Sequence, residues 1–322
     1  MVSATELFNS NDEYKCTLSP ELQKLAQEEL REDENTRTQA IQQVRDWINK
    51  HPNIKKCRTD SIFLLRFLRT KKFSVPLTCE MIERYLTIRQ LFPDWFTKLD
   101  IEDKDIADII DNGYLVPLPK RDDDGRQVLL SCAGKFDPFK HSSSHMVRVH
   151  SLVMEALMDD EVNQIKGYTY INDESGLQMG HISLWSLKDV RNIMKCVQKS
   201  SPMRHKNSHF INIPQYAVKI FEFAISLLSD KLKSRIHLDK SIDELKAKVN
   251  PKILPEEYGG EGGSLKSMIE DCKKLLREKR DVILALDEMQ IDINFKDNPL
   301  VSEMNEELGI GVEGSFRKLL VD

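Results

Sequence analysis

Length, composition and charge already exclude several classes of protein. The chain has 322 residues, enough for two domains or for one large domain with appendages. Its 47 Lys and Arg residues against 52 Asp and Glu residues give a formal net charge of −5, which argues against a general nucleic-acid binder. A hydrophobic share of 40% and a charged share of 31% are typical of a globular chain and not of a disordered one.

The two ends of the chain lack the usual targeting signals. No basic stretch followed by an apolar run opens the sequence, and residue 2 is Val2 instead of the Gly that myristoylation requires. The longest strongly apolar stretch, 220–228, is about half as long as the ~20 residues of a spanning helix. Six widely spaced cysteines without a CxxC pair indicate reduced thiols. We therefore expect a cytoplasmic protein.

The first hundred residues have a helical pattern. Ser19-Pro20-Glu21 combines an N-cap residue, a Pro at the first helical position and an acid in the first turn, which predicts a helix start. Further helices are predicted around 41–48, over 61–70 with Asp60 as its cap, and over 75–90. We therefore predict a polar tail over 1–18 and a helical domain over 19–95.

Beyond Gly113 the pattern changes to strands that alternate with helices. A turn signal at 122–125 precedes the apolar run 127–132, which is typical of a buried strand. The other predicted elements are strands at 167–172, 208–213 and 236–238 and helices over 144–159, 186–199, 214–228 and 242–249. This alternation indicates an α/β fold with a mainly parallel sheet that helices cover. We predict that this domain spans 96–262 and that a helix and tail occupy 263–322, the helix running from 264 to 278 or beyond.

Motifs for catalysis or metal binding are missing from the sequence. GxSxG, HExxH and GxxxxGK[ST] do not occur, and the GxGxxG match at 309–314 lacks the preceding strand of a dinucleotide site. His141 and His145 are expected in a loop that enters a helix, where a structural or surface role is favoured over a metal site. His205 and His209 would face the same side of an extended segment, too far apart for a compact site.

Two acidic pairs are candidates for a general acid and base: Asp173 with Glu174, and Glu256 with Glu257. Nothing in the sequence brings the two pairs together. Roles in turns and at helix ends are favoured for them. We therefore expect that the protein is not an enzyme and has neither a cofactor nor a metal.

The predicted helix over 214–228 is unusually apolar. In its part from 216 to 228 only Lys219, Glu222 and Ser226 are polar, and they form a narrow stripe. Such a helix is either buried on several sides or covers an apolar cavity. The residue pattern by itself favours the first alternative, a helix buried in the hydrophobic core (plain core).

Basic residues are concentrated in three segments. From Lys50 to Lys72 there are eight Lys or Arg residues against the single acid Asp60. Arg204 and Lys206 alternate at the entry to a strand, and Lys231 and Arg235 are spaced to share one helix face. Each segment by itself is typical of a solvated surface, whereas their convergence in space would form a site for an anion or a phosphoinositide.

Four segments, in this order and spacing, resemble a known family. They are DSIFLLRFLRTKKF at 60–73, DESGL at 173–177, HFINIP at 209–214 and LPEEYGG at 254–260. Together they resemble the CRAL-TRIO (Sec14-like) lipid-binding proteins, most of all the alpha-tocopherol transfer protein and cellular retinaldehyde-binding protein branch and its invertebrate members. The resemblance covers about residues 19 to 265, and the tail at 311–318 is also similar to the ending of invertebrate members.

The resemblance implies a helical N-terminal domain packed on a Sec14-like lobe. In such a lobe the mainly parallel sheet forms the floor of an apolar pocket, expected to enclose ~300 to 1,000 Å³. The helix after Pro214 would be a mobile gate over this pocket. This implication reverses the preference for plain core, because a gate that swings open would present its apolar face to a bilayer.

The resemblance also implies ligand-contacting positions. On the helix after the first strand these are Val147, His150, Ser151 and Met154, and on a later helix they are Ile193, Cys196 and Val197; Phe221 and Ile225 are added from the apolar face of the gate. His150 and Asn172 occupy positions that resemble smaller or apolar pocket residues of the tocopherol binder. Tocopherol, a retinoid, a sterol or another prenyl lipid therefore all stay open as the ligand.

Phosphoinositide headgroups in the tocopherol-transfer branch are held at positions that match Lys71, Arg204, Lys206, Lys231 and Arg235, and all five are basic here. The expected protein is a monomeric intracellular carrier that binds one hydrophobic lipid and exchanges it during transient peripheral contact with membranes. The alternative is a phosphoinositide-binding trafficking or regulatory adaptor of the same fold without bulk transfer.

Overall fold

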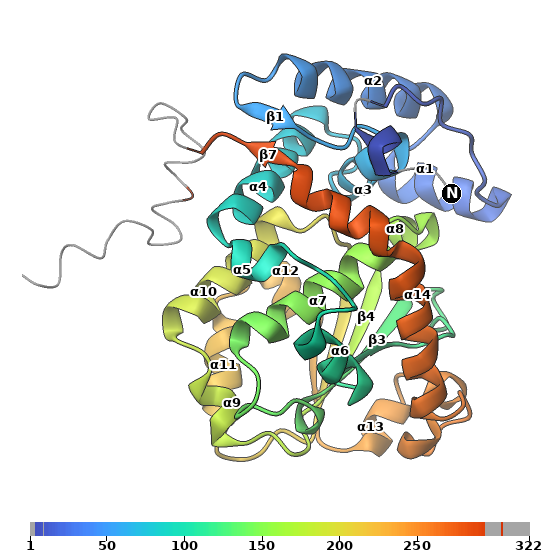
Figure 1. Cartoon of the computed structure of the whole chain (residues 1–322). Coiled ribbons are helices and arrows are strands. Elements are labelled where there is room, and N and C mark those ends of the chain that lie inside the picture. Colours follow the sequence, from blue (N-terminus) through green and yellow to red (C-terminus); the bar gives the residue numbers. More distant parts are fainter. Residues whose placement is uncertain (1–3, 9, 294–303, 305–322) are drawn as a thin grey trace, which may run out of the picture.

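A computed structural model describes residues 4–8, 10–293 and 304 (Figure 1). Its N-terminal part consists of helices, and Ser19, Asp33 and Asp60 cap three of them as side-chain acceptors. The helices of this part are α1 (Pro20–Leu30), α2 (Glu34–Lys50), α3 (Ser61–Thr70), α4 (Val75–Leu91) and α5 (Pro93–Phe96). The helix starts predicted at Pro20 and Ser61 are confirmed.

Helix α3 lies at the centre of this part. Its apolar residues other than Ile62 are buried, and the rings of Phe63, Phe67 and Tyr85 meet edge to face at centroid distances of 5.1 to 6.1 Å. The segment predicted as a polar tail contains the short helix η1 (Ala4–Leu7), and its apolar side chains Leu7 and Phe8 are buried. The first residues therefore pack on the helical part.

Three arginines of the basic segment 50–72 are buried, which the sequence did not predict. Arg66 pairs with Glu155 at 2.7 Å and with Asp159 at 2.7 Å. Arg58 also pairs with Asp159, at 3.2 Å, and Arg69 pairs with Glu32 and Glu161, each at 2.8 Å. These charges cannot form a solvated surface, because the stretch from Arg58 to Arg69 lies against the ends of α7 (Ser143–Met158) and α8 (Glu161–Lys166), which supply carboxylates. They join the helical part to the α/β part.

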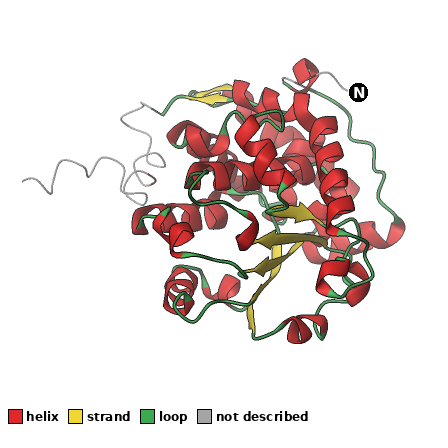
Figure 2. Cartoon of the chain, turned by 60° about the horizontal axis from the view of Figure 1, so that its bottom comes forward, coloured by secondary structure: helices red, strands yellow, loops and turns green. Residues whose placement is uncertain are grey.

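The α/β part is built on a five-stranded sheet of order β2-β3-β4-β5-β6 (Figure 2). The strands are β2 (Leu115–Pro117), β3 (Gln127–Cys132), β4 (Tyr168–Asp173), β5 (His205–Ile211) and β6 (Ile236–Asp239). Strand β2 is antiparallel to β3, and the other neighbours are parallel. The predicted α/β class with a mainly parallel sheet is confirmed.

Helices cover both faces of this sheet. On one face α6 (Lys104–Asp111) and α7 (Ser143–Met158) bury Leu129 and Tyr168 in a shared cluster. On the other face α13 (Ile242–Lys246) and the start of α14 (Leu265–Ala285) pack with Ile171 and Ile211. The remaining helices of the described chain include α8 (Glu161–Lys166), α9 (Met179–Ser183), α10 (Leu187–Lys195), α11 (Val218–Ser226) and α12 (Asp230–Lys233).

The end of the described chain returns to its beginning. Helix α14 runs along the molecule toward the helical part (Figure 1), where β7 (Gln290–Ile291) pairs antiparallel with β1 (Ile54–Lys56). The predicted C-terminal helix is confirmed and extends to Ala285. The GxGxxG match at 309–314 lies outside the described residues. In the part of the chain that the structure describes, no helix is long and apolar enough to cross a membrane.

Strand β5 corrects one prediction about the histidines. It begins at His205, earlier than expected, and the β4–β5 register shifts between Tyr168 and Thr169. Because the irregularity breaks the period of two, His205 stacks on Tyr170 on the α7 face, whereas His209 stacks on His237 on the opposite face. His205 and His209 therefore do not face the same side.

Candidate functional site

The candidate site begins with the sheet face that carries α7. On this face Tyr170 lies opposite Ser208 and Asn172 lies opposite Phe210 in the β4–β5 register. The rings of Phe210 and Phe221 meet at a centroid distance of 5.5 Å, which places α11 over β5. Figure 1 shows α10 and α11 beside α7 in the lower part of the molecule. The region between the sheet, α7 and α11 is therefore the first component of the candidate site.

Helix α11 is apolar and yet not buried. None of its residues, which run from Val218 to Ser226, has a buried side chain, and Ile220 is 40% exposed. An apolar helix that packs as plain core would bury most of these side chains. The residue pattern alone therefore gave the wrong preference, because the apolar side chains of this helix stay partly accessible.

Three titratable side chains face the same region. His150, His205 and Tyr170 are each partly accessible to a water-sized sphere. Desolvation nevertheless lowers the pKa of His150 and of His205 to about 4 and raises the pKa of Tyr170. Side chains on an open surface are well hydrated and do not show such shifts. These three side chains are therefore poorly hydrated although none of them is fully buried.

The polar atoms around this region are paired within the protein. The Tyr114 hydroxyl and His150 Nε2 are 3.0 Å apart, and the Tyr170 hydroxyl donates to Met154 Sδ at 3.1 Å. His205 Nε2 and the Ser208 hydroxyl are 2.7 Å apart. A lining of this kind presents apolar surface with a few fixed polar groups, which suits a hydrophobic molecule that carries few polar atoms.

The structure places the predicted ligand-contacting residues unevenly. Val147, His150, Ser151 and Met154 share one face of α7 at spacings of three and four, and Phe221 contacts the sheet face. The side chains of Ile193 and Ile225 are half-buried, whereas Val197 is 46% exposed. Cys196 packs on the other side of its helix, in a cluster with Ile88 and Met304.

Four residues of the candidate site were missed by sequence reasoning. They are Tyr114, Tyr170, His205 and Phe210. The period-two pattern of the predicted strands was a usable signal for Tyr170 and Phe210, because both lie on the strand face opposite the buried Ile171 and Ile211.

Lys71, Arg204, Lys206, Lys231 and Arg235 form the second component of the site, which we call the basic patch. Desolvation lowers the pKa of Lys231, and the charges of Arg235, Lys72 and Arg204 lower it further. Desolvation also lowers the pKa of Lys71; the charge of Glu80 opposes this lowering, and the charges of Arg84 and Lys231 add to it. Like charges act this way only at short range. The segments that end α3, begin β5 and follow α11 therefore do converge.

A single carboxylate faces two members of the basic patch. Glu29 of α1 pairs with Arg204 at 2.8 Å and with Lys206 at 3.4 Å. Burial alone would raise the pKa of Glu29, but the hydrogen bond and the charges from these two cations outweigh it and lower the pKa. Among the described residues, Lys71, Lys231 and Arg235 form no ion pair with a carboxylate. The patch thus holds excess positive charge.

An open groove of about 580 Å³ lies beside Lys72. Most of the residues that line it are polar: Gln27, Arg31, Asp33, Thr36, Lys72, Phe73 and Ser74. The groove therefore extends the polar surface next to the basic patch and does not match an apolar lipid pocket.

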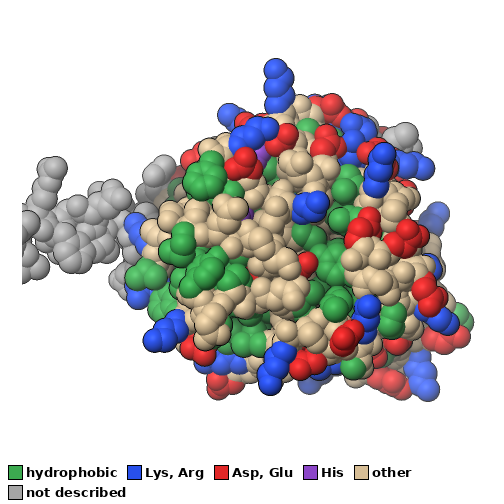
Figure 3. Space-filling view, turned by 90° about the horizontal axis from the view of Figure 1, so that it is seen from below, with side chains coloured by type: hydrophobic (Ala, Val, Ile, Leu, Met, Phe, Trp, Pro, Cys, Tyr) green, Lys and Arg blue, Asp and Glu red, His purple; other side chains and the backbone are tan. Residues whose placement is uncertain are grey.

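Large hydrophobic side chains are exposed near α9, α10 and α11. They include Phe139, Met179, Leu187, Tyr216 and Ile220. Figure 3 shows hydrophobic side chains gathered in patches on the lower face of the molecule, where α9 and α11 lie in Figure 1. Exposed apolar surface of this kind is typical of an interaction face.

One carboxylate of each acidic pair, Asp173 and Glu257, has hydrogen-bond partners within the protein. Asp173 accepts hydrogen bonds from Tyr258 at 2.7 Å and from Asn212 at 2.9 Å. The Glu257 carboxylate accepts from the backbone N–H of Leu265 at the start of α14, at 2.9 and 3.0 Å.

The histidine pair at the start of α7 also has protein partners. His141 Nε2 lies 2.9 Å from Asp108, and His145 closes the capping box of α7 with Ser142. Within the described ranges, no three His, Cys, Asp or Glu side chains are grouped to hold a metal ion.

The fold combines a helical part with a mainly parallel sheet that α11 partly covers. Comparison with known proteins identifies the family to which such a chain belongs. The chain belongs to the CRAL-TRIO family: the model of the CRAL/TRIO domain matches residues 111–260, and a model described as a Pinta-like UBA domain matches residues 33–106. Clavesin-1 of Xenopus laevis is 34% identical over 244 residues, which are 76% of this chain and 74% of that protein. Clavesin-2 of Homo sapiens is 32% identical over 76% of this chain and 75% of its own length.

A solved structure supports the fold. The crystal structure of Sfh5 matches with a TM-score of 0.51 and 12% identity, covering 77% of this chain and 98% of that chain. Family and fold together make this chain a protein of the lipid-binding kind. The resemblance to the CRAL-TRIO (Sec14-like) proteins is confirmed at the level of the family, and the tocopherol and retinaldehyde branch stays a prediction.

Proposed function

We propose that this protein binds one hydrophobic lipid beneath α11 and transfers it at membranes, with phosphoinositide engaging the basic patch. The observation that carries this proposal is that α11, an apolar helix, has no buried residue while the side chains below it are desolvated. A bound lipid would supply the apolar contacts that α11 lacks. Opening of α11 would place the same apolar side chains in the bilayer.

The lining favours a ligand with little polarity. His150 is neutral at pH 7, because desolvation lowers its pKa to about 4, and it lies 3.0 Å from the Tyr114 hydroxyl. A neutral imidazole and a phenol suit a hydroxyl or carbonyl group of a ligand better than a carboxylate, whose charge would be buried without a partner. Tocopherol, a retinoid, a sterol or another prenyl lipid meets this requirement.

The basic patch supports contact with anionic headgroups. Its members Arg204 and Arg235 anchor their guanidinium groups on the backbone carbonyls of Ile165 and His205, so their positive ends are fixed in place. Fixed guanidinium groups beside Lys71 and Lys231 provide several donors for phosphate. Two of the four acidic groups considered for catalysis, Asp173 and Glu257, are engaged in hydrogen bonds within the protein, which supports a non-catalytic role.

Lipid transfer between vesicles tests the proposal. The Phe221→Asp variant is expected to lose most uptake of a fluorescent lipid, because it puts a charge where α11 meets Phe210. Lys219→Asp is the matched control, since Lys219 is an exposed residue of the same helix. Equal uptake by wild type, variant and control would contradict a ligand site beneath α11.

The second candidate function is a phosphoinositide-binding adaptor without bulk transfer, which the excess charge of the basic patch favours. A Lys71→Ala, Lys231→Ala variant removes two exposed or half-buried cations that make no ion pair among the described residues. The adaptor function is favoured if this variant loses binding to phosphoinositide vesicles and if the wild type transfers no lipid. Unchanged binding would contradict a role of the patch in either function.

A further inference from the structure

Glu174 is a buried acidic residue directly after β4. It is 8% exposed, and in the part of the chain that the structure describes its carboxyl has neither a hydrogen-bond partner nor an ion-pair partner. The neighbouring Asp173, by contrast, accepts hydrogen bonds from two side chains. Buried polar groups are as a rule paired, and each exception calls for an explanation. The carboxyl of Glu174 is such an exception.

The strand register directs Glu174 to the sheet face that carries α7. Asp173 accepts a hydrogen bond from Tyr258, which packs with the hydrophobic cluster on the opposite face. Although β4 ends at Asp173, the Glu174 N–H still donates to the Ile211 carbonyl at 3.0 Å, so the strand ladder continues through Glu174. Because side chains alternate along a strand, Glu174 follows Asn172 on the face of the candidate site.

Glu174 lies at the same level of the sheet as the pair of Tyr114 and His150. The Tyr114 carbonyl accepts a hydrogen bond from the Cys132 N–H at 2.8 Å, and Cys132 lies opposite Asp173 in the β3–β4 register. Burial raises the pKa of Tyr114, and the charge of Glu174 raises it further. The Tyr114 hydroxyl lies 3.0 Å from His150 Nε2. We call Glu174, Tyr114 and His150 the polar cluster.

The charge state of Glu174 limits what it can bind. Burial and the charge of Asp173 raise its pKa to about 7. A neutral carboxyl has an O–H donor and a carbonyl acceptor, whereas an ionised carboxyl only accepts. A ligand hydroxyl can bind either form, and a ligand aldehyde can bind only the neutral form. A ligand carboxylate would add a second buried negative charge, and a ligand ammonium would require that two charges be buried.

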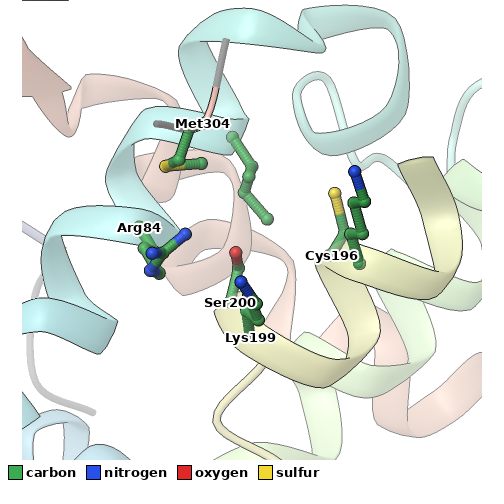
Figure 4. A pocket seen from close by; sticks show the side chains of 7 residues that line it. Arg84, Cys196, Lys199, Ser200 and Met304 are labelled. Atoms are coloured by element: carbon green, nitrogen blue, oxygen red, sulfur yellow. The ribbon is translucent and has the colours of Figure 1, made fainter. Parts of the chain in front are cut away.

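A polar pocket beside α10 offers no room for the end group of a lipid. It lies between α4 and η3 (Cys196–Ser200), a π-helical turn that continues α10. Figure 4 shows Arg84 and Ser200 around this pocket, together with the buried Cys196 and Met304. Its volume of about 10 Å³ holds at most a single water molecule. A lipid end group therefore finds more suitable partners in the polar cluster.

We propose that Glu174 binds the hydroxyl group of the lipid ligand and thereby selects lipid alcohols over lipid acids, an inference that rests on the proposed ligand site beneath α11. The apolar body of the lipid lies along Tyr170 and Phe210, and its hydroxyl reaches Glu174 beside Tyr114 and His150. Without ligand, the unpaired carboxyl destabilises the protein, whereas in the complex it gains a partner. A group that costs stability and improves binding is a binding group and not a structural one.

Binding of retinoids that differ only in their end group tests this selection. Retinol, retinaldehyde, retinoic acid and retinylamine are titrated into the full chain in neutral buffer, and quenching of tryptophan fluorescence reports binding. Wild type is expected to bind retinol about tenfold more tightly than retinoic acid, and Glu174→Leu is expected to lose about tenfold in retinol affinity together with this preference. The same order of affinities in both proteins, or a preference of wild type for retinoic acid or retinylamine, would overturn the proposal.

Two further variants control for the substitution itself. Glu174→Gln keeps a donor and an acceptor without the charge, so it is expected to restore retinol binding relative to Glu174→Leu and to accept retinoic acid better than wild type does. Glu256→Leu is the matched control, since Glu256 is an exposed carboxylate of the other acidic pair. Loss of retinol binding in Glu256→Leu as large as in Glu174→Leu would contradict a specific role of Glu174.

The stability of the lipid-free protein separates a binding role from a structural one. Glu174→Leu is expected to unfold at a higher urea concentration than wild type, because it removes an unpaired buried carboxyl. Glu257→Leu is expected to unfold at a lower urea concentration, because the Glu257 carboxylate accepts a hydrogen bond from the Leu265 N–H. A lower urea midpoint of Glu174→Leu would assign Glu174 a structural role and overturn the inference.

The outcomes distinguish this inference from the proposed function. Lipid uptake by wild type with unchanged selectivity in Glu174→Leu contradicts the role of Glu174 alone. If wild type carries a lipid from expression instead of a retinoid, mass spectrometry identifies the end group of that lipid; a hydroxyl supports the inference and a free carboxylate overturns it. A wild type that takes up no lipid of any kind contradicts the proposed function, and this inference with it.

Discussion

Glu29 of α1 is the acidic side chain that faces the basic patch. Its carboxylate lies within 2.8 Å of Arg204 and 3.4 Å of Lys206, where a phosphate oxygen would have to bind. A phosphoinositide headgroup that binds the basic patch as proposed would have to displace Glu29 before it could use these two cations. The proposal therefore predicts that this contact weakens binding of anions.

Removal of the charge of Glu29 is expected to strengthen binding. Partly exposed ion pairs contribute about 0.2 to 1 kcal/mol each, so Glu29→Gln should bind phosphoinositide vesicles about two- to fivefold more tightly in a sedimentation assay. Glu28→Gln is the control, because Glu28 is exposed and pairs only within α1, with Lys24. Equal affinity of Glu29→Gln and wild type would show that Glu29 does not compete with the headgroup.

His150 makes the stability of the protein depend on pH. Its pKa is lowered from 6.5 to about 4 by desolvation, so between these values the unfolded chain binds a proton that the folded protein does not. The resulting stability is fully present above pH 6.5 and is lost as the pH falls toward 4. We expect the decrease in unfolding free energy between pH 7 and pH 5, measured in urea, to be smaller in His150→Gln than in wild type. An identical decrease would mean that His150 is as hydrated in the folded as in the unfolded chain.

At the scale of elements, α3 joins the two parts through buried charge. Arg66 is fully buried, and its pKa is raised because the charges of Asp159 and Glu155 outweigh desolvation. The same arrangement lowers the pKa of Asp159 to about 2. Burial would raise the pKa of Asp159, but the charges of Arg58 and Arg66 outweigh it.

Replacement of Arg66 is therefore expected to be costly. Arg66→Met leaves Glu155 and Asp159 with fewer partners in the interior and should lower the unfolding free energy by about 3 to 5 kcal/mol in a urea titration. Lys24→Met, which breaks an exposed pair within α1, should change it by less than about 1 kcal/mol. A small effect of Arg66→Met would indicate that water or a neighbouring cation replaces the guanidinium.

Helix caps and apolar patterns in the sequence predicted the helices and strands, but they did not predict the irregularities within them. Ser19 and Asp60 mark helix starts because a cap is satisfied within three residues, and the alternation of β3 to β6 with helices follows from local apolar patterns. The π-helical turn η3 and the shifted register of β5 depend on what packs around them, so no local pattern revealed them. His205 entered the site through that register, which places it on Tyr170.

At the scale of the whole molecule, contacts between distant segments create both components of the site. The basic patch combines the end of α3, the start of β5 and the segment after α11, more than 100 residues apart in the chain from Lys71 to Arg204. The sequence indicated the charges but not their convergence, and the burial of Arg58, Arg66 and Arg69 was invisible in it. The resemblance to a family supplied the expected arrangement, and the structure supplied Glu29, Tyr114 and the unpaired carboxyl of Glu174.

Native mass spectrometry of the purified full chain tests the central claim most directly. We predict one hydrophobic lipid per protein molecule, taken up during expression or after incubation with vesicles, and its loss in Phe221→Asp but not in Lys219→Asp. Detection of protein without lipid under both conditions, with no difference between wild type and Phe221→Asp, would contradict a lipid site beneath α11.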